Sequence, residues 1–83
     1  MYIDVYDIAG EQVVDEHIAD TIFEVISKSV EKTIWLDFYG VDFVSESFIK
    51  RYLDLKFDML GEKQVLEVNL HSGVEDQFDN IKG

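Results

Sequence analysis

The sequence predicts a small two-layer α/β domain in which a mainly parallel sheet carries its helices on one face, in the order β-α-β-α-β-α. Two observations predict this class. Segments with the alternating pattern of strands alternate with segments of helical spacing, and the absence of proline with only scattered glycines argues against linkers or disorder between them. Such an order favours parallel strands joined by right-handed crossovers. A chain of this length is expected to form a single domain over residues 1–83.

The first half of the chain predicts one strand and one helix. Tyr2 to Ile8 alternates in the manner of a strand and is followed by a turn at Ala9-Gly10. Asp15 is placed to cap the helix that follows. The apolar side chains of this helix fall within an arc of roughly 160° at helical spacing, and they are Ile18, Ala19, Ile22, Phe23, Val25, Ile26 and Val30.

The second half predicts two further strands and two further helices. Thr33 to Tyr39 is rich in β-branched and aromatic residues and reads as the central strand. Apolar residues at helical spacing predict a helix from Glu46 to Leu60 that ends at Gly61. Gln64 to Leu70 alternates as the third strand, and Ser72 to Glu75 has the spacing of a capping box. The last helix carries an apolar stripe made of Val74, Phe78 and Ile81.

Alternation along the strands also predicts what each face of the sheet carries. The residues expected to face the helices are Ile3, Val5, Ile34, Leu36, Phe38, Leu66, Val68 and Leu70. The opposite face is expected to carry Tyr2, Tyr6, Trp35 and Tyr39 among Asp4, Asp37, Val65, Glu67 and Asn69. Aromatic residues are enriched at interface hot spots, so this face is a candidate surface for docking or dimerisation. The alternative is that a short strand or a terminal segment covers it.

The charge of the chain limits the kind of partner. Eighteen acidic against seven basic residues leave a net charge of -11, which disfavours direct binding to nucleic acid. The absence of cysteine, of a signal peptide and of an apolar run near the ~20 residues of a membrane span predicts a cytoplasmic protein that binds no membrane. One use of the acidic charge is to imitate phosphates, and the row Glu16, Asp20 and Glu24 would then meet a basic surface.

Candidate catalytic groups are expected to gather at the carboxyl ends of the strands. That set comprises Asp7, Glu11, Asp42, Ser45, Ser47, His71 and Ser72. A hydrolase built on Ser47 and His71 would need a nucleophile elbow and an oxyanion loop, and neither pattern is present. Metal-binding spacings and a phosphate-binding glycine loop are also missing. We therefore expect no enzyme activity, no cofactor and no metal.

The stretch "IWLDFYGVDFVSESFI", Ile34 to Ile49, joins an apolar strand ending in aspartate to a short turn, an apolar pair and a serine-bearing helix start. On these residues the chain resembles the STAS superfamily of sulfate-transporter and anti-sigma-factor-antagonist domains. It looks closest to the small bacterial and phage STAS-like domains of unknown function, and the resemblance covers Thr33 to Leu70. In anti-sigma-factor antagonists the position matching Ser47 is phosphorylated by a partner kinase, so the resemblance implies a phosphosite there.

The second predicted helix offers another candidate contact surface. Lys50 and Arg51 form the most basic patch of the chain, and Phe57 widens the apolar side of the same helix. In the proteins that the chain resembles, the corresponding helix contacts a partner. The alternative is that Glu46 and Asp54 offset the two basic residues through pairs along the helix.

Taken together, these patterns predict a non-catalytic, regulatory module of STAS-like type that binds another protein or a second copy of itself. The alternative is an acidic inhibitor that occupies a basic, nucleic-acid-binding surface. The two differ in salt sensitivity, because an electrostatic decoy loses affinity at moderate ionic strength and an aromatic interface loses little.

Overall fold

The computed structural model describes residues 1–82. Along this range the chain forms β1 (Tyr2–Asp4), α1 (Val5–Ala9), β2 (Gln12–Val13), α2 (His17–Lys28), β3 (Thr33–Asp37), β4 (Phe43–Val44), α3 (Glu46–Asp58), β5 (Gln64–Val68) and α4 (Ser72–Lys82).

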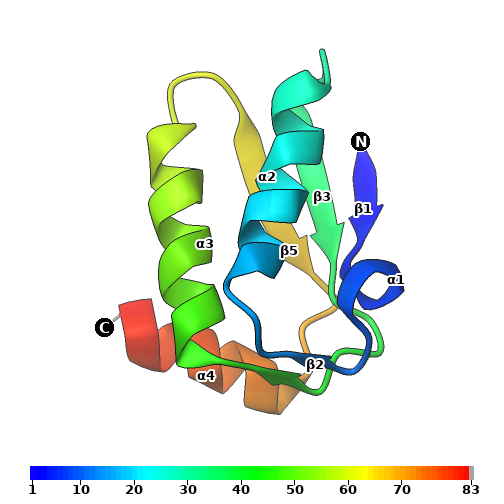
Figure 1. Ribbon diagram of the computed structural model, residues 1–83, viewed down its shortest axis with the longest axis vertical. Helices are drawn as coiled ribbons and strands as arrows, with labels where there is room; N and C mark the ends of the chain where they lie inside the picture. The colour runs from blue at the N-terminus through cyan, green and yellow to red at the C-terminus, as the bar shows by residue number, and fades with distance from the viewer. Residues whose placement is uncertain (83) are drawn as a thin grey trace.

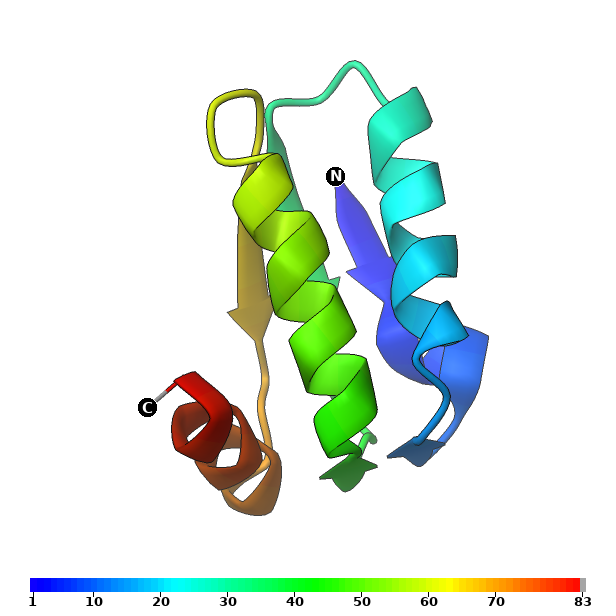
Figure 2. The same ribbon diagram turned by 60° about the vertical axis from the view of Figure 1, so that its left-hand side comes forward.

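The main sheet has three parallel strands in the order β1-β3-β5, so β3 is central. Helices α2 and α3 pack side by side on one of its faces, which makes two layers (Figures 1 and 2). A second parallel pair, β2-β4, lies with α1 and α4 near the end of the sheet toward which the strands run (Figure 1). The predicted two-layer fold with a mainly parallel sheet and a central strand beginning at Thr33 is confirmed.

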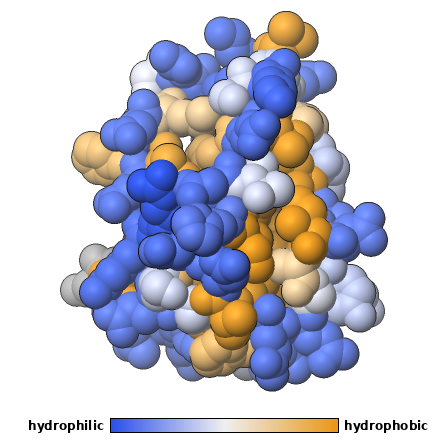
Figure 3. All heavy atoms as spheres, in the orientation of Figure 1, coloured by the Kyte–Doolittle hydropathy of each residue, from blue (hydrophilic) through white to orange (hydrophobic). Residues whose placement is uncertain are grey.

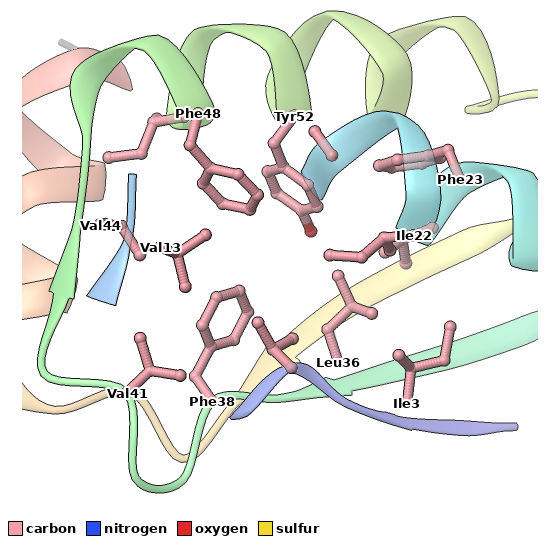
Figure 4. Close-up of a cluster of buried hydrophobic side chains, with 14 of the residues drawn as sticks. Ile3, Val13, Ile22, Phe23, Leu36, Phe38, Val41, Val44, Phe48 and Tyr52 are labelled. Atoms are coloured by element: carbon pink, nitrogen blue, oxygen red, sulfur yellow. The ribbon is translucent and has the colours of Figure 1, made fainter. Parts of the chain in front are cut away.

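The core lies between the two layers, and α2, β3 and α3 contribute to it the faces that the sequence periods predicted. Ile34 and Leu36 of β3 are fully buried beneath α2 and α3. Figure 4 shows Phe48 and Tyr52 reaching down from α3 toward Phe38 and Leu36. The rings of Phe48 and Tyr52 are stacked, with centroids 5.8 Å apart. Full burial of an apolar side chain of this size contributes about 1.5–3 kcal/mol, so each ring of this cluster stabilises the domain measurably.

Ser45 caps α3 as predicted, whereas the starts of α2 and α4 each differ from the predicted cap by one residue. The N-cap position of α2 is Glu16, which makes no side-chain cap bond, and Asp15 precedes it. Asp15 accepts a hydrogen bond from the His17 N–H at 2.9 Å, and Ser45 Oγ accepts one from the Phe48 N–H at 3.1 Å. At α4 the cap is His71, because its Nδ1 accepts from the Gly73 N–H at 3.1 Å and its carbonyl accepts from the Glu75 N–H. The predicted capping box therefore begins one residue too late.

The predicted strand from Tyr2 to Ile8 is wrong beyond Asp4, where α1 begins. Asp4 Oδ1 accepts from the Asp7 N–H at 3.3 Å, which offers the backbone a helical turn in place of a longer strand. Gly10 ends this turn at φ 81°, a left-handed conformation that glycine adopts without strain. Tyr6 consequently belongs to a helix and packs against Gly40.

The predicted facing of β5 is also wrong. Leu66 pairs with Trp35 and Glu67 with Leu36, so Leu66 and Val68 lie on the sheet face away from the helices, and Val65 and Glu67 face α3. The strand ends at Val68, so Asn69 and Leu70 lie outside it. Apolar residues occupy both faces of this strand, so alternation alone does not choose between them. The Glu67 carboxylate is instead directed inward by two donors, Tyr52 Oη at 2.5 Å and Lys56 Nζ at 2.6 Å.

Candidate functional site

The sheet face away from the helices carries an apolar centre. Tyr2, Trp35 and Leu66 lie in one register across the three strands, with Val68 beside them. The Tyr2 and Trp35 rings are stacked with centroids 6.3 Å apart and an interplanar angle of 22°. Tyr2 is 66% exposed and Trp35 is 36% exposed. We call Tyr2, Trp35, Leu66 and Val68 the open face.

The two carboxylates beside the open face are already used by the fold. Asp37 Oδ1 accepts from the Tyr39 N–H and from Asn69 Nδ2, both at 2.9 Å. Asp4 caps α1 through the Asp7 N–H. These bonds hold the charges at the carboxyl ends of β1 and β3, so the middle of the open face remains free of charge.

The four aromatic residues predicted to share this face are divided into two pairs. Tyr2 and Trp35 lie on it, as predicted. Tyr6 lies in α1 and Tyr39 in the turn after β3, so neither belongs to a strand. Tyr39 is 77% exposed at the carboxyl end of the sheet. The structure adds Leu66 and Val68, which the sequence analysis assigned to the other face.

The basic patch of α3 is offset by carboxylates within the chain. Lys50 Nζ lies 2.8 Å from Glu46 Oε1 on the same helix. Arg51 Nε donates to Asp20 Oδ1 at 2.8 Å and so ties α3 to α2. Phe57 remains exposed near the end of α3, at 74%. The structure places Lys50, Arg51 and Phe57 on one helix. The positive charges of Lys50 and Arg51, which were predicted to contact a partner, pair with carboxylates of the same chain.

In the acidic row Glu16, Asp20 and Glu24 at α2, two carboxylates pair with basic residues of the same chain. Asp20 contacts Arg51 and also His17, whose Nδ1 lies 3.2 Å from Asp20 Oδ2. The hydrogen bonds from Arg51 and His17 lower the pKa of Asp20, and the bond to Asp20 raises the pKa of His17. Glu24 pairs with Lys28 at 3.0 Å. Two of the three carboxylates predicted to imitate phosphates therefore have cationic neighbours in their own helix layer.

Ser47 lies exposed in the first turn of α3. Its Oγ is 3.1 Å from Ser45 Oγ, which in turn donates to the Val14 carbonyl at 2.9 Å. Because Ser45 supplies both the cap and the bond to Val14, Ser47 is not required to begin the helix. Its hydroxyl is on the surface, where a modifying enzyme could reach it, and it stands on the helix layer and not on the open face.

A groove of about 490 Å³ lies at the carboxyl end of the main sheet, lined by Phe38, Tyr39, Gly40, Val41, Asp42, Asn69, Leu70 and His71. It brings together Asp42 and His71 from the predicted set. The groove includes neither Ser47 nor Ser45, and the His71 Nδ1 atom is held by the Gly73 N–H. Over residues 1–82, no three histidine, aspartate or glutamate side chains are grouped to hold a metal ion.

The sequence analysis missed a polar cluster between β5 and α3. The Glu67 side chain is 9% exposed and accepts from Tyr52 and Lys56, whose side chain is 23% exposed. Burial, together with the nearby Glu67 charge, raises the pKa of Tyr52 far above its usual range. The available signal was the single acid within the apolar run Val65 to Val68.

No model of a known protein family matches the chain, and neither does any curated protein or solved structure. Among the residues that the structure describes, no helix is both long and apolar enough to span a bilayer.

Proposed function

We propose that the chain is a non-catalytic protein-interaction module whose contact surface is the open face. The observation that carries this proposal is the stacked, exposed pair Tyr2 and Trp35 at the centre of a sheet face whose neighbouring acids are bonded within the fold. Rigid aromatic side chains on strands bury large area at low entropic cost and are enriched at hot spots. A cytoplasmic, regulatory role of STAS-like type, with Ser47 as its phosphosite, belongs to the same proposal and is supported by the resemblance of Ile34 to Ile49.

The alternative proposal is an acidic inhibitor. The ion pairs of Asp20 and Glu24 with basic residues of the same chain make it the less favoured of the two. A phosphate-imitating surface needs carboxylates available to a basic partner, whereas Asp20 and Glu24 have cationic neighbours already. The remaining support for an inhibitor is the net charge of -11.

Photo-crosslinking from two matched positions tests the proposal. Benzoylphenylalanine replaces Trp35 in one variant and Phe57 in the other, because both side chains are exposed aromatics and they lie on opposite layers. In a lysate of the cells that produce the protein, brought to about 0.5 M salt before irradiation, we expect protein adducts from position 35 and few from position 57. Adducts mainly from position 57 would refute the open face as the contact surface, and adducts that form only when irradiation is done at low salt would favour the inhibitor.

A further inference from the structure

Resting on the proposed interaction function, we propose that the partner contributes an extended segment, which adds as a fourth strand to the free edge of β5, in the groove beside α3. The open face and this edge then form one continuous contact surface, because Leu66 belongs to both. Three features support the added strand, which are the direction of the backbone groups of β5, the groove along this strand and the charge around it.

The outer backbone groups of β5 are directed away from the sheet. Within residues 1–82, β5 has a neighbouring strand only on the β3 side. The Gln64 N–H donates to the Lys32 carbonyl at 2.9 Å, and the Phe38 N–H donates to the Val68 carbonyl at 3.0 Å. Backbone groups alternate in direction along a parallel strand, so Gln64 and Val68 face β3 and Val65 turns its N–H and C=O outward. The group that matches such a donor and acceptor is another extended backbone.

A groove of about 540 Å³ runs along this edge, between β5 and the end of α3. Lys56 and Leu60 of α3 form one wall, and Gln64, Val65 and Leu66 of β5 form the other. Val65 is 3% exposed, and the part of it that reaches the surface lines this groove. Figure 2 shows β5 at the outer border of the sheet, with α3 beside it and α4 beyond its end. A strand added here places one side chain in the groove and the next one on the open face beside Leu66.

The other edge strand, β1, is less suited to accept a strand. It has three residues, against five in β5, and the chain turns into α1 directly after Asp4. A short edge offers few backbone groups for pairing, and a short edge strand is a common protection against unwanted pairing. The longer edge with a groove beside it is therefore the place for the added strand.

The walls of the groove predict an apolar residue opposite Val65. Leu60 is 62% exposed and lines the groove. Lys56 Nζ lies 2.6 Å from Glu67 Oε2, so the charge of this wall is compensated within the fold. On the face seen in Figure 3, hydrophilic side chains cover most of α3. An apolar side chain of the segment therefore gains most by entering the groove, where it leaves water for contact with Leu60.

The charge around the groove predicts basic residues on either side of that apolar residue. Glu62 is exposed and lines the groove. Lys63 lines it too, but its Nζ donates to the carbonyls of Ser29 and Glu31 in the loop between α2 and β3. The net charge of -11 attracts a segment that carries lysine or arginine. The same charge repels an acidic segment, and a second copy of this chain is acidic.

A phage-displayed library of random linear peptides of about ten residues, selected on the intact chain at about 0.15 M salt, supplies the probe. We expect selected peptides with an apolar residue between basic ones and a Kd on the order of 10 μM. Replacing Val65 by the matching α-hydroxy acid keeps the side chain and exchanges the backbone N–H for an oxygen, which should raise the Kd about tenfold. The same exchange at Val30, which is 93% exposed in the loop after α2, is the matched control and should change the Kd by less than about twofold.

Methylation of backbone nitrogens along a selected peptide gives a second readout. A peptide bound as a strand directs every second N–H to β5, so methylation should weaken binding at alternate positions and be tolerated between them. Circular dichroism and urea unfolding verify that both α-hydroxy acid variants are folded.

Equal effects of the exchanges at Val65 and Val30, or a methylation pattern without alternation, would overturn the added strand. The absence of any selected peptide that binds more tightly than about 1 mM would overturn it as well. Sedimentation equilibrium covers the remaining occupant, because a dimer that is lost on the exchange at Val65 would make a second copy the added strand and refute a partner segment. None of these results changes the crosslinking from position 35, so failure at the edge of β5 is distinguishable from failure of the open face.

Discussion

Removing the hydroxyl of Tyr52 should destabilise the fold even though its ring remains in place. The Tyr52 side chain is fully buried, and its hydroxyl donates to the Glu67 carboxylate at 2.5 Å. Tyr52→Phe keeps the stacking with Phe48 and leaves Glu67 with Lys56. A hydrogen bond to a charged group is worth about 1.5–3 kcal/mol. We therefore expect the free energy of unfolding to fall by about 2 kcal/mol, out of roughly 4–12 kcal/mol for a domain of this size.

Urea unfolding followed by Trp35 fluorescence and by circular dichroism measures this loss. The melting temperature should fall by roughly 10 °C, because 1 kcal/mol shifts it by about 4–8 °C in a domain of this length. Tyr39→Phe is the matched control, since Tyr39 is 77% exposed, and it should change the free energy of unfolding by less than about 0.5 kcal/mol. Equal stabilities of Tyr52→Phe and Tyr39→Phe would refute the reasoning.

A double-mutant cycle with Glu67→Gln assigns the loss to this contact. If Tyr52 and Glu67 act through one hydrogen bond, the double variant should lose less than the sum of the single losses, with a coupling of about 1–2 kcal/mol. Additive losses would mean that the Tyr52 hydroxyl contributes through another neighbour.

Further predictions concern the turn at Gly40, the stability of the fold at alkaline pH and the cap of α3. Gly40→Ala should lower the free energy of unfolding by about 1–2 kcal/mol, because Gly40 has φ +90° and an added Cβ would lie 2.9 Å from the Tyr6 ring. At Gly61 an added Cβ would have no atom within 4 Å, so Gly61→Ala should leave the free energy of unfolding in urea nearly unchanged. Because the folded-state pKa of Tyr52 is raised, the free energy of unfolding should fall by about 1.4 kcal/mol per pH unit above about pH 10, and Tyr52→Phe should lack this part of the decline in alkaline titration. Ser45→Ala should cost about 1 kcal/mol in thermal unfolding and Ser47→Ala distinctly less; the reverse order would contradict the assignment of the cap.

The longer elements could be predicted because each has one apolar side and one polar side. The helical spacing of Ile22, Phe23 and Ile26 and of Phe48 and Tyr52 places all five residues in the core. The cap at Ser45 follows from a hydroxyl immediately before an apolar helix, and the alternation of Ile34, Trp35 and Leu36 gives the correct facing of β3.

The remaining elements are either too short to show a periodic pattern or carry apolar residues on both faces, so the pattern does not determine their structure. Helix α1 has five residues, less than two turns, so no helical period can show in it, and its signals are the cap at Asp4 and the left-handed Gly10. Strands β2 and β4 have two residues each. In β5, apolar residues stand on both faces, and a contact with α3 decides which way Glu67 points. The open face was therefore only half predicted, since Leu66 and Val68 are placed by that contact.

The parallel pairings give the backbone the form of a short coil, although the sequence shows no repeat. Tyr2 pairs with Trp35, Val13 with Val44 and Thr33 with Gln64, and Asp20 bonds to Arg51 at a separation of 31. Equivalent positions thus recur after 31–33 residues, and each turn of the coil rests on its neighbour. In architectures of this kind, stability is mostly a sum of contacts between adjacent turns. Lengthening a loop at the rim, such as the one between α2 and β3, should therefore displace only the residues beside it and leave the pairing of the other turns in register.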